Sequence, residues 1–317
     1  MPSVSVVIAC YNAADTLGIQ LEALARQTYR GSWNVIISDN GSTDHSRLVA
    51  QRYESRLPGL EIVDSSGTAG AGHARNIAAQ HSSADFLAFC DADDEVAVDW
   101  LETMMAALAR NPFVAGRFES RKLNSERVLR SRPLQQSTGL QESPFGPGLP
   151  HAGAGNMGVR RDLFLAVGGF DQAVGTLEDT DLCWRIQLAG TPLIFAPDSV
   201  VHVRLRSSFT KMWRQGWNYG HAAALLERRY GNKPIASVTA VTTSIAVIKA
   251  AQEAQEQPDP SKVGSALKLL RENPTPGALM WAVGWHVGNR AMPDDALPPL
   301  PPPTPNKKKD NRLRQAG

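Results

Sequence analysis

Cysteine is scarce in this chain. The three cysteines, Cys10, Cys90 and Cys183, are far apart and lie in apolar or helical sequence. Secreted domains held together by disulfides carry an even, closely spaced set, and this odd, scattered set does not fit that class. We therefore expect three reduced, buried thiols and a cytoplasmic protein.

Long hydrophobic runs are also lacking. The longest uncharged stretches, PIASVTAVTTSIAVI at 234–248 and PTPGALMWAVGWHVGN at 274–289, are shorter than the roughly 20 residues that span a bilayer. The N-terminus leads directly into VSVVIAC without a basic region or a small-residue cleavage site. The sequence therefore predicts neither a membrane-spanning helix nor a secretion signal.

No charge of one sign dominates the composition. The net charge of +2 argues against nucleic acid as a partner, because phosphate binding needs a basic face. The 317 residues are 42% hydrophobic and 20% charged, which is typical of a soluble globular protein with one large domain and appendages.

The first hundred residues alternate two patterns. Apolar runs predict four strands, each followed by helix-type sequence: Val4–Cys10, Asn34–Ser38, Leu60–Val63 and Phe86–Cys90. A helix is predicted at Val98–Arg110. This alternation predicts an α/β fold with a doubly wound, mostly parallel sheet. Ligands bind beyond the carboxyl ends of such strands. Asp39 and Asp91 lie at two of these ends and Tyr11 just past a third, so we expect one shared pocket.

The remainder of the chain is less regular. We expect an irregular loop at 118–150, helix-containing segments around AGNMGVRRDLF and LEDTDLCWRIQLAG, and short strands near PLIFAP and SVVHVRL. A helix at Phe209–Tyr230 and two more helical stretches follow. The Pro-rich, basic end PPLPPPTPNKKKDNRLRQAG has no means of burying a core and is expected to be disordered.

An acidic cluster follows the fourth predicted strand. The stretch FLAFCDADDE, Phe86–Glu95, holds four carboxylates in its last five residues. Carboxylates repel one another, and oxygen-rich sites favour hard ions such as Mg²⁺ or Mn²⁺ that bridge to substrate phosphates. Asp91 and Asp93 have the spacing to share one ion, with Asp94 and Glu95 left to cap the next turn. The alternative is a solvated acidic loop that caps the following helix.

Three further segments contain candidate residues. The glycine-rich GTAGAGHARN opens a helix, where backbone N–H groups and Arg75 can meet an anion, although a plain flexible loop explains it equally. In LEDTDLCWRI, Glu178 and Asp179 either satisfy the helix N-terminus or present a general base to the pocket. His202, in VVHV, is either a core histidine or a metal ligand.

In their order along the chain, these segments resemble the inverting glycosyltransferases of family 2. The resemblance covers about Val4 to Arg204 and is carried by VSVVIACYNAADTL, IISDNGSTD, GHARNIA, FLAFCDADD, GAGNMGVRRDLF, GGFD, LEDTDLCWRIQLAG and VVHV. It implies the GT-A fold. We expect a nucleotide-sugar-binding half at 1–115, an acceptor-binding and catalytic half at 116–205, a helical extension at 206–292 and a disordered tail at 293–317.

The resemblance also implies how the donor, a nucleotide-sugar, would be held. Asp39 would accept a hydrogen bond from a pyrimidine N–H, which favours a UDP-sugar and also admits a dTDP-sugar. The residues implied to contact the donor or the adjoining acceptor are Ala9, Tyr11, Asp39, Arg75, Asp91, Gly155 and Asn156.

The metal and the catalytic base follow from the same resemblance. Asp93 would be the direct ligand of Mn²⁺ or Mg²⁺, with Asp91 closer to the ribose or sugar, and His202 matches a histidine that some members add. Asp179 matches the usual catalytic base, with Glu178 beside it. The implied reaction is a single inverting displacement onto an acceptor hydroxyl. The segment MWRQGWNY does not reproduce the Gln-x-x-Arg-Trp motif of processive members.

The resemblance further implies a carbohydrate or lipid-linked acceptor, as in the synthesis of bacterial cell-surface polysaccharides or glycolipids. Residues 204–230 are rich in arginine and tryptophan, and a basic, aromatic amphipathic helix can lie in the headgroup zone of a membrane. One expectation is peripheral contact with the inner face of the cell membrane. The other is a helix that packs its aromatic side chains on the catalytic domain.

Two other functions remain open at this point. A phosphotransferase of the haloacid dehalogenase type also places D-x-D after a strand, but it favours Thr or Val where this chain has Glu95. A catalytically silent, glycosyltransferase-like binding module would keep the fold and bind a nucleotide-sugar without transferring it. The acids at positions 39, 91, 93 and 179 argue against the silent module.

Overall fold

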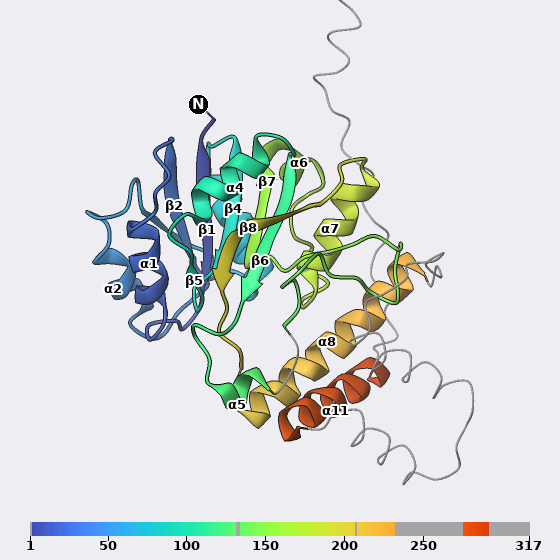
Figure 1. Ribbon diagram of the computed structural model, residues 1–317. Helices are drawn as coiled ribbons and strands as arrows, with labels where there is room; N and C mark the ends of the chain where they lie inside the picture. The colour runs from blue at the N-terminus through green and yellow to red at the C-terminus, as the bar shows by residue number, and fades with distance from the viewer. Residues whose placement is uncertain (1, 131–133, 207, 232–274, 292–317) are drawn as a thin grey trace, which may run out of the picture.

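The centre of the protein is one eight-stranded sheet. The computed structural model describes residues 2–130, 134–206, 208–231 and 275–291, and the strand order is β3-β2-β1-β4-β7-β6-β8-β5 (Figure 1). The strands are β1 Val4–Cys10, β2 Trp33–Asp39, β3 Glu61–Asp64, β4 Phe86–Asp91, β5 Glu95–Val96, β6 Phe113–Glu119, β7 Asn156–Arg160 and β8 Ile194–His202.

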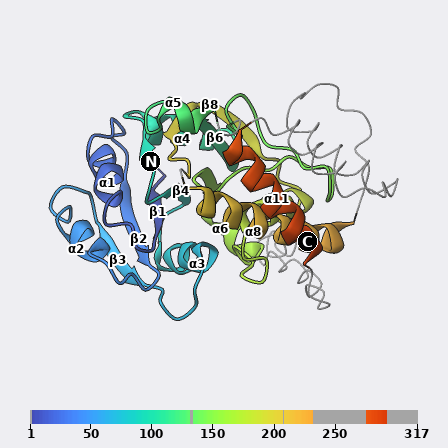
Figure 2. The ribbon, with the colours of Figure 1, turned by 90° about the horizontal axis from the view of Figure 1, so that it is seen from below.

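Helices cover both faces of this sheet. They are α1 Leu17–Ala25, α2 Ser46–Gln51, α3 Ala71–His81, α4 Trp100–Leu108, α5 Glu126–Leu129, α6 Arg161–Ala166, α7 Glu178–Leu188, α8 Phe209–Tyr230 and α11 Pro276–Arg290. Figure 2 shows α1 and α4 on one side of the strands and α3 and α6 on the other. One core contains Leu21 and Trp100, and the opposite core contains Phe164 and Leu182.

The first four strands form the parallel half of the sheet, as predicted. β1 pairs in parallel with β2 and β4, and β2 pairs in parallel with β3. Strands buried on both faces read as continuous β-branched runs, and Val4, Val6, Val7 and Ile8 are all fully buried. The expected mixed α/β fold with a mostly parallel sheet is therefore confirmed.

The second half of the sheet differs from the expectation in all four strands. The sequence did not indicate β6 at Phe113–Glu119. Nor did it indicate β7, which runs antiparallel to both β4 and β6. The two short strands expected near PLIFAP and SVVHVRL are one strand, β8, which stays paired with β6 through an irregularity after Gly116. The expectation that Glu95 caps a turn is wrong, because Glu95 lies in β5 and pairs with His202 of β8.

The sheet is continuous across the expected boundary between the two halves. The predicted boundary at residues 115 and 116 lies inside β6, which pairs with strands on both sides. Of the helical extension expected at 206–292, the described part is α8 and α11. The rest of it, and the tail expected at 293–317, lie outside the described residues. Cys10, Cys90 and Cys183 are free and buried, as predicted.

Helix α8 lies beneath the sheet, with α11 on the side of α8 that faces away from it (Figure 1). None of the helices in the described ranges combines the length and the apolar character that a membrane span needs. The C-terminal end of α8 is joined to the sheet domain by packing, since Leu226 contacts a small core built around Trp184, and Tyr230 meets Trp184 edge to face at 5.1 Å.

A buried charge network completes this junction. Asp181 of α7 accepts hydrogen bonds from Arg185 Nε at 2.6 Å, Arg229 at 2.9 Å and the Tyr230 hydroxyl at 2.7 Å. Arg229 also pairs with Asp171 at 2.7 Å. The Asp181 side chain is 0% exposed and that of Arg229 is 3% exposed. Two arginines therefore depend on one buried carboxylate.

We predict that Asp181→Ala lowers the free energy of unfolding by about 3–5 kcal/mol, because it leaves Arg185 and Arg229 buried with part of their charge uncompensated. Urea denaturation measures the change. The matched control is Asp162→Ala, which breaks the exposed Arg160–Asp162 pair and should cost about 1 kcal/mol or less. Equal effects of the two substitutions would contradict the assignment.

Candidate active site

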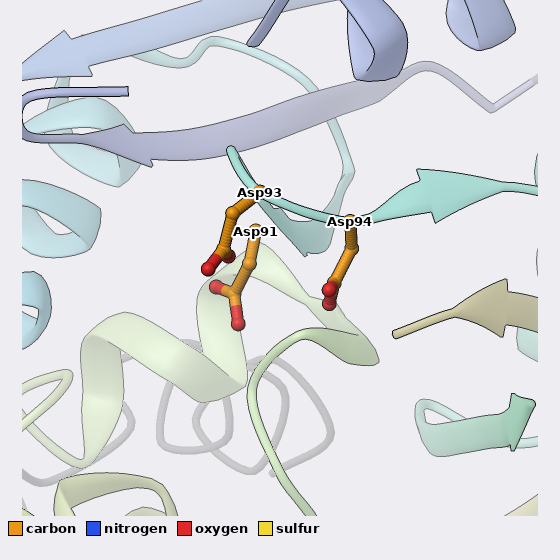
Figure 3. Close-up of side chains that lie close together, drawn as sticks. All are labelled: Asp91, Asp93 and Asp94. Atoms are coloured by element: carbon orange, nitrogen blue, oxygen red, sulfur yellow. The ribbon is translucent and has the colours of Figure 1, made fainter. Parts of the chain in front are cut away.

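The acidic cluster lies where β4 ends. Asp91 is the last residue of β4, and Asp93 and Asp94 follow before β5 begins. Carboxylate oxygens of the three residues lie within 4.8 Å of one another, and Figure 3 shows the three side chains pointing in the same direction from the chain. The expectation that Asp94 caps the following turn is wrong, because its Oδ1 accepts from the backbone N–H of Arg204 at 2.8 Å.

The electrostatics of the cluster favour a cation. Burial raises the pKa of Asp93, and the neighbouring Asp91 charge raises it further. The same two causes raise the pKa of Asp94 well above its usual range. Carboxylates held this close repel one another, and a set made only of oxygen donors suits a hard divalent ion. The donor chemistry therefore fits Mg²⁺ or Mn²⁺.

Arg75 of α3 connects this cluster to α7. Its guanidinium donates to Asp91 Oδ1 at 2.7 Å and to Glu178 Oε1 at 3.0 Å, and it lies over the Phe170 ring at 5.4 Å. The Arg75 side chain is 7% exposed. The charges of Asp91 and Glu178 outweigh the effect of burial and raise its pKa. A permanent buried cation thus holds two acidic segments that are far apart in the sequence.

Asp179, at the start of α7, accepts hydrogen bonds from backbone N–H groups and also lines a cavity. Asp179 Oδ1 accepts from the Thr180 N–H at 2.8 Å, and Oδ2 accepts from the Ala154 N–H at 3.2 Å. Burial is the main cause that raises the pKa of Asp179. Burial and then the Asp179 charge raise the pKa of Glu178 to about 7. Asp179 is therefore hydrogen-bonded at the helix start, and it also faces the cavity described next.

A cavity of about 300 Å³ brings these groups together. The acidic cluster and Arg75 line one side, Asp179 lines another, and α8 closes the cavity with Met212, Gln215 and Tyr219. Leu177 also lines it, in a left-handed conformation with φ of 66°. A non-glycine residue in that region is strained, and such strain concentrates at functional sites.

Gly155 is required by the close packing of the acids. A Cβ at this position would lie 2.7 Å from Asp91 Oδ2, which is closer than a carbon and an oxygen can approach without a shift. Gly155 lines the cavity, as expected from the sequence. The absence of a side chain thus lets the Asp91 carboxylate face the cavity.

The predicted nucleotide-contacting residues lie at the same sheet edge, beyond the lining of this cavity. Ala9 is paired with Asp91 on β4 and with Ser38 on β2. Asp39, at the end of β2, accepts from the Ser42 N–H at 3.0 Å. Tyr11 is 63% exposed. The shared edge of the sheet thus holds two groups of predicted residues, with Asp91 adjacent to both.

Three more predicted site residues, Glu178, Asn156 and His202, are not among those that line the cavity. Glu178 contacts Arg75 instead. Asn156 is fully buried, and its amide accepts from Trp100 Nε1 and donates to the carbonyls of Arg117 and Ser199. The structure therefore gives Asn156 a role in holding strands together. His202 lies on β8, where Nδ1 is 2.6 Å from Glu119 Oε2, and it is not part of the Asp91–Asp93–Asp94 group.

Sequence reasoning missed one residue that shapes the cluster. Arg204 donates its backbone N–H to Asp94 and its Nε to the Asp93 carbonyl at 3.1 Å. These bonds join the loop after β4 to the loop after β8. The basic residues that follow VVHV were a signal for it, although no spacing rule links them to residues more than a hundred positions earlier.

We predict that Gly155→Ala abolishes the metal-dependent nucleotide binding that the family resemblance implies while leaving the protein folded, because the added methyl group displaces the Asp91 carboxylate. Calorimetric titration with UDP and Mn²⁺ measures the binding. The matched control is Gly139→Ala, since a Cβ at Gly139 meets nothing within 4 Å. Retained affinity in Gly155→Ala would show that Asp91 does not need this geometry.

Comparison with known proteins agrees with the fold and identifies the family. The family model "Glycosyl transferase family 2" matches residues 5–168. Glycosyltransferase AglE of Haloferax volcanii is 29% identical over 203 residues, covering 63% of this chain and 66% of AglE. The Escherichia coli enzyme WfgD, a UDP-Glc:alpha-D-GlcNAc-diphosphoundecaprenol beta-1,3-glucosyltransferase, is 32% identical over 125 residues, covering 38% of this chain and 48% of WfgD. Both matches span less than two thirds of the relative's own length.

A solved structure supports the same conclusion at the level of the fold. The mannosyltransferase PcManGT from Pyrobaculum calidifontis, in complex with GDP-Man and Mn²⁺, superposes with a TM-score of 0.61 at 20% identity, covering 91% of this chain and 87% of PcManGT. The family model spans more than half of the 317 residues, including β1, β4 and the acidic cluster. The chain therefore belongs to glycosyl transferase family 2, and its sheet has the GT-A fold.

Proposed function

We propose that this chain is a metal-dependent, inverting glycosyltransferase that moves a sugar from a nucleotide-sugar to an acceptor hydroxyl. One observation carries the proposal: the acidic cluster and Asp179 line the same cavity, and Arg75 ties Asp91 to the residue next to Asp179. This arrangement supports a cation site for the donor diphosphate and a general base on the same cavity. Membership of this family removes the haloacid dehalogenase alternative.

Asp93 and Asp91 would hold the cation, and Asp94 would fix the loop that carries them through its bond to Arg204. A bound Mg²⁺ or Mn²⁺ supplies charge stabilisation to the departing diphosphate. His202 would join the ligands only with its Nε2, since Nδ1 is held by Glu119. The relative PcManGT, solved with GDP-Man and Mn²⁺, supports a site of this kind.

The proposed transfer is a single displacement. The acceptor oxygen forms a bond to the anomeric carbon while the bond from that carbon to the diphosphate oxygen breaks, and the diphosphate leaves with the electron pair. Asp179 takes the acceptor proton on a carboxylate oxygen, as a general base does. The two backbone N–H groups that Asp179 accepts hold the carboxylate in position for this step.

The donor would lie along the sheet edge from Asp39 to Asp91. We favour a UDP-sugar, with a dTDP-sugar as the alternative, because Asp39 at the end of β2 can accept from a pyrimidine N–H. Ala9 and Tyr11 would complete the base and ribose contacts. WfgD is named for UDP-Glc and PcManGT was solved with GDP-Man, so the relatives support a nucleoside diphosphate sugar without deciding the base.

The acceptor would be a carbohydrate, either free or linked to a lipid. WfgD acts on a sugar carried by diphosphoundecaprenol, which supports a lipid-linked acceptor in the synthesis of bacterial cell-surface polysaccharide or glycolipid. A lipid-linked acceptor requires work at a membrane surface. Peripheral contact with the inner face of the cell membrane is therefore part of the proposal.

We predict that Asp179→Asn lowers kcat by about 10²–10⁴, the range typical for loss of a general base, while the Kd for the donor stays close to that of the wild type. The base must be deprotonated, and the pKa of Asp179 is raised. An aspartate ordinarily titrates near pH 4. The acid limb of the pH–rate profile should therefore lie above that pH, and it should disappear in the variant.

Asp162→Asn is the control for Asp179→Asn, because Asp162 is exposed. Steady-state transfer assays with UDP-, GDP- and dTDP-sugars and Mn²⁺ give the rates. Near wild-type turnover in Asp179→Asn would remove Asp179 from the role of base. Donor binding with neither transfer nor donor hydrolysis in the wild-type protein would favour the silent binding module.

We predict that Asp93→Ala abolishes the Mn²⁺-dependent part of UDP binding, because it removes the proposed direct ligand. Calorimetry with UDP, in the presence and absence of Mn²⁺, measures this difference. Asp99→Ala is the matched control: Asp99 is exposed and lies shortly after the cluster. Unchanged metal-dependent affinity in Asp93→Ala would show that the ion binds elsewhere.

A further inference from the structure

Helices α8 and α11 contain the same sequence pattern. The stretch WRQGWNYG, residues 213–220 of α8, and the stretch WAVGWHVG, residues 281–288 of α11, both read W-x-x-G-W-x-x-G. In each, a tryptophan and a glycine recur together every four residues, so both types of residue lie along one side of the helix. Four of the seven tryptophans of the chain lie in these two stretches.

The shared pattern locks the helices together. A Cβ at Gly216 or Gly220 would overlap the carbonyl oxygen of Trp281 or Trp285, and a Cβ at Gly284 or Gly288 would overlap that of Trp213 or Trp217. These contacts advance in the same direction along both helices, so the helices are parallel. Backbones meet where the glycines lie, and the large side chains are therefore displaced to the outside of the pair.

Within the described residues, this packing leaves the outer apolar surface of α11 partly exposed. The buried residues of α11 are all small: Gly277, Ala282, Gly284 and Gly288. Its larger apolar residues stay partly exposed, and Val287 is 47% exposed. On α8, Phe209 is 42% exposed and Trp213 is 38% exposed. Figure 2 shows α11 lying across the underside of the protein next to α8.

Positive charge is concentrated on the same pair. α8 and α11 contain five basic residues, Lys211, Arg214, Arg228, Arg229 and Arg290, and one acid, Glu227. Arg229 is used internally by Asp171 and Asp181, whereas the other four basic residues are exposed. The whole chain has a net charge of only +2. The pair therefore presents tryptophan, aliphatic and basic side chains together, with almost no negative charge.

We propose that the outer surface of the α8–α11 pair docks on an anionic phospholipid bilayer, with the exposed Trp213 in the headgroup zone. Tryptophan prefers this zone because its ring is apolar and its N–H is polar. Basic residues close to the surface gain from the negative potential of anionic lipids. A second copy of this chain fits less well, because two such surfaces would bring like charges together.

Docking would place the cavity next to the membrane. Met212, Gln215 and Tyr219 line the cavity, and Trp213 and Arg214 lie beside them in the sequence of the same helix. An acceptor with a lipid anchor would then reach Asp179 without leaving the bilayer. This consequence rests on the proposed function. The docking surface specifies the membrane contact proposed above, but it is argued from α8 and α11 alone and does not require transfer activity.

The test is flotation of the full chain with vesicles of phosphatidylcholine alone or mixed with phosphatidylglycerol. We expect binding to the mixed vesicles only, weakened by salt because the basic term is screened. Lys211→Glu with Arg214→Glu should lower the partition coefficient roughly tenfold or more, and Trp213→Ala should lower it as well. Neither change touches the cavity lining, so donor hydrolysis without vesicles should be unaffected.

Matched controls have the same chemistry at other exposed positions. Arg52→Glu with Arg110→Glu reverses the same number of exposed charges, and Leu48→Ala truncates an apolar side chain that is 53% exposed. Equal loss of binding in controls and test variants would overturn the proposal. The absence of vesicle binding would also overturn it. If light scattering then showed a dimer that Trp213→Ala dissociates, the surface would be an interface between two copies of the chain. Vesicle binding without donor hydrolysis would sink the proposed function and leave the docking surface intact.

Discussion

Repulsion among the carboxylates at the end of β4 is the constraint that shapes this site. The chain contains it with one buried cation, Arg75, whose guanidinium contacts Asp91 and Glu178 at once. An arginine is suited to this position because it stays charged when buried and can donate to two carboxylates in fixed directions. The charges of Arg204 and Arg206 compensate Asp93 only in part, and that of Arg204 does the same for Asp94, so burial and the Asp91 charge still raise the pKa of both. This remaining repulsion is the physical reason to place a divalent ion beside them.

Small residues determine how closely the groups around Arg75 can approach. Gly72 precedes it on α3, and a Cβ there would lie 3.1 Å from both Glu178 Cγ and Phe170 Cβ. Gly155 plays the same part for Asp91. The two glycines lie on opposite sides of the ion-pair chain from Asp91 to Glu178. A larger residue at either position would separate the cluster from Asp179, the proposed base.

Sequence reasoning reached the parts of the fold that depend on local pattern. The run Val4–Cys10 predicts its strand to the residue because burial on both faces leaves an unbroken apolar signature. β7 was missed because its residues, NMGVR, are polar or small at the ends and gain their burial only from pairing with β4 and β6. For the site, Asp91 and Asp93 lie together as their spacing predicts. Asn156 shows the limit, since only the tertiary structure reveals that its amide is satisfied inside the sheet.

Helix α8 connects the cavity to the outer surface of the α8–α11 pair. Its C-terminal end is held by Asp181, four residues after the α7 N-cap Leu177 and two after Asp179, so the proposed base and the residue that anchors α8 share one turn of α7. Its N-terminal half lines the cavity with Met212, and the glycine face of the helix receives α11. A displacement of the α8–α11 pair would therefore also move the turn of α7 that carries Asp179. If the pair docks on a membrane, Asp179, the proposed base, would lie at a fixed distance from the lipid surface. The reason is that the ion pair of the buried Arg229 with Asp181 fastens α8 to α7.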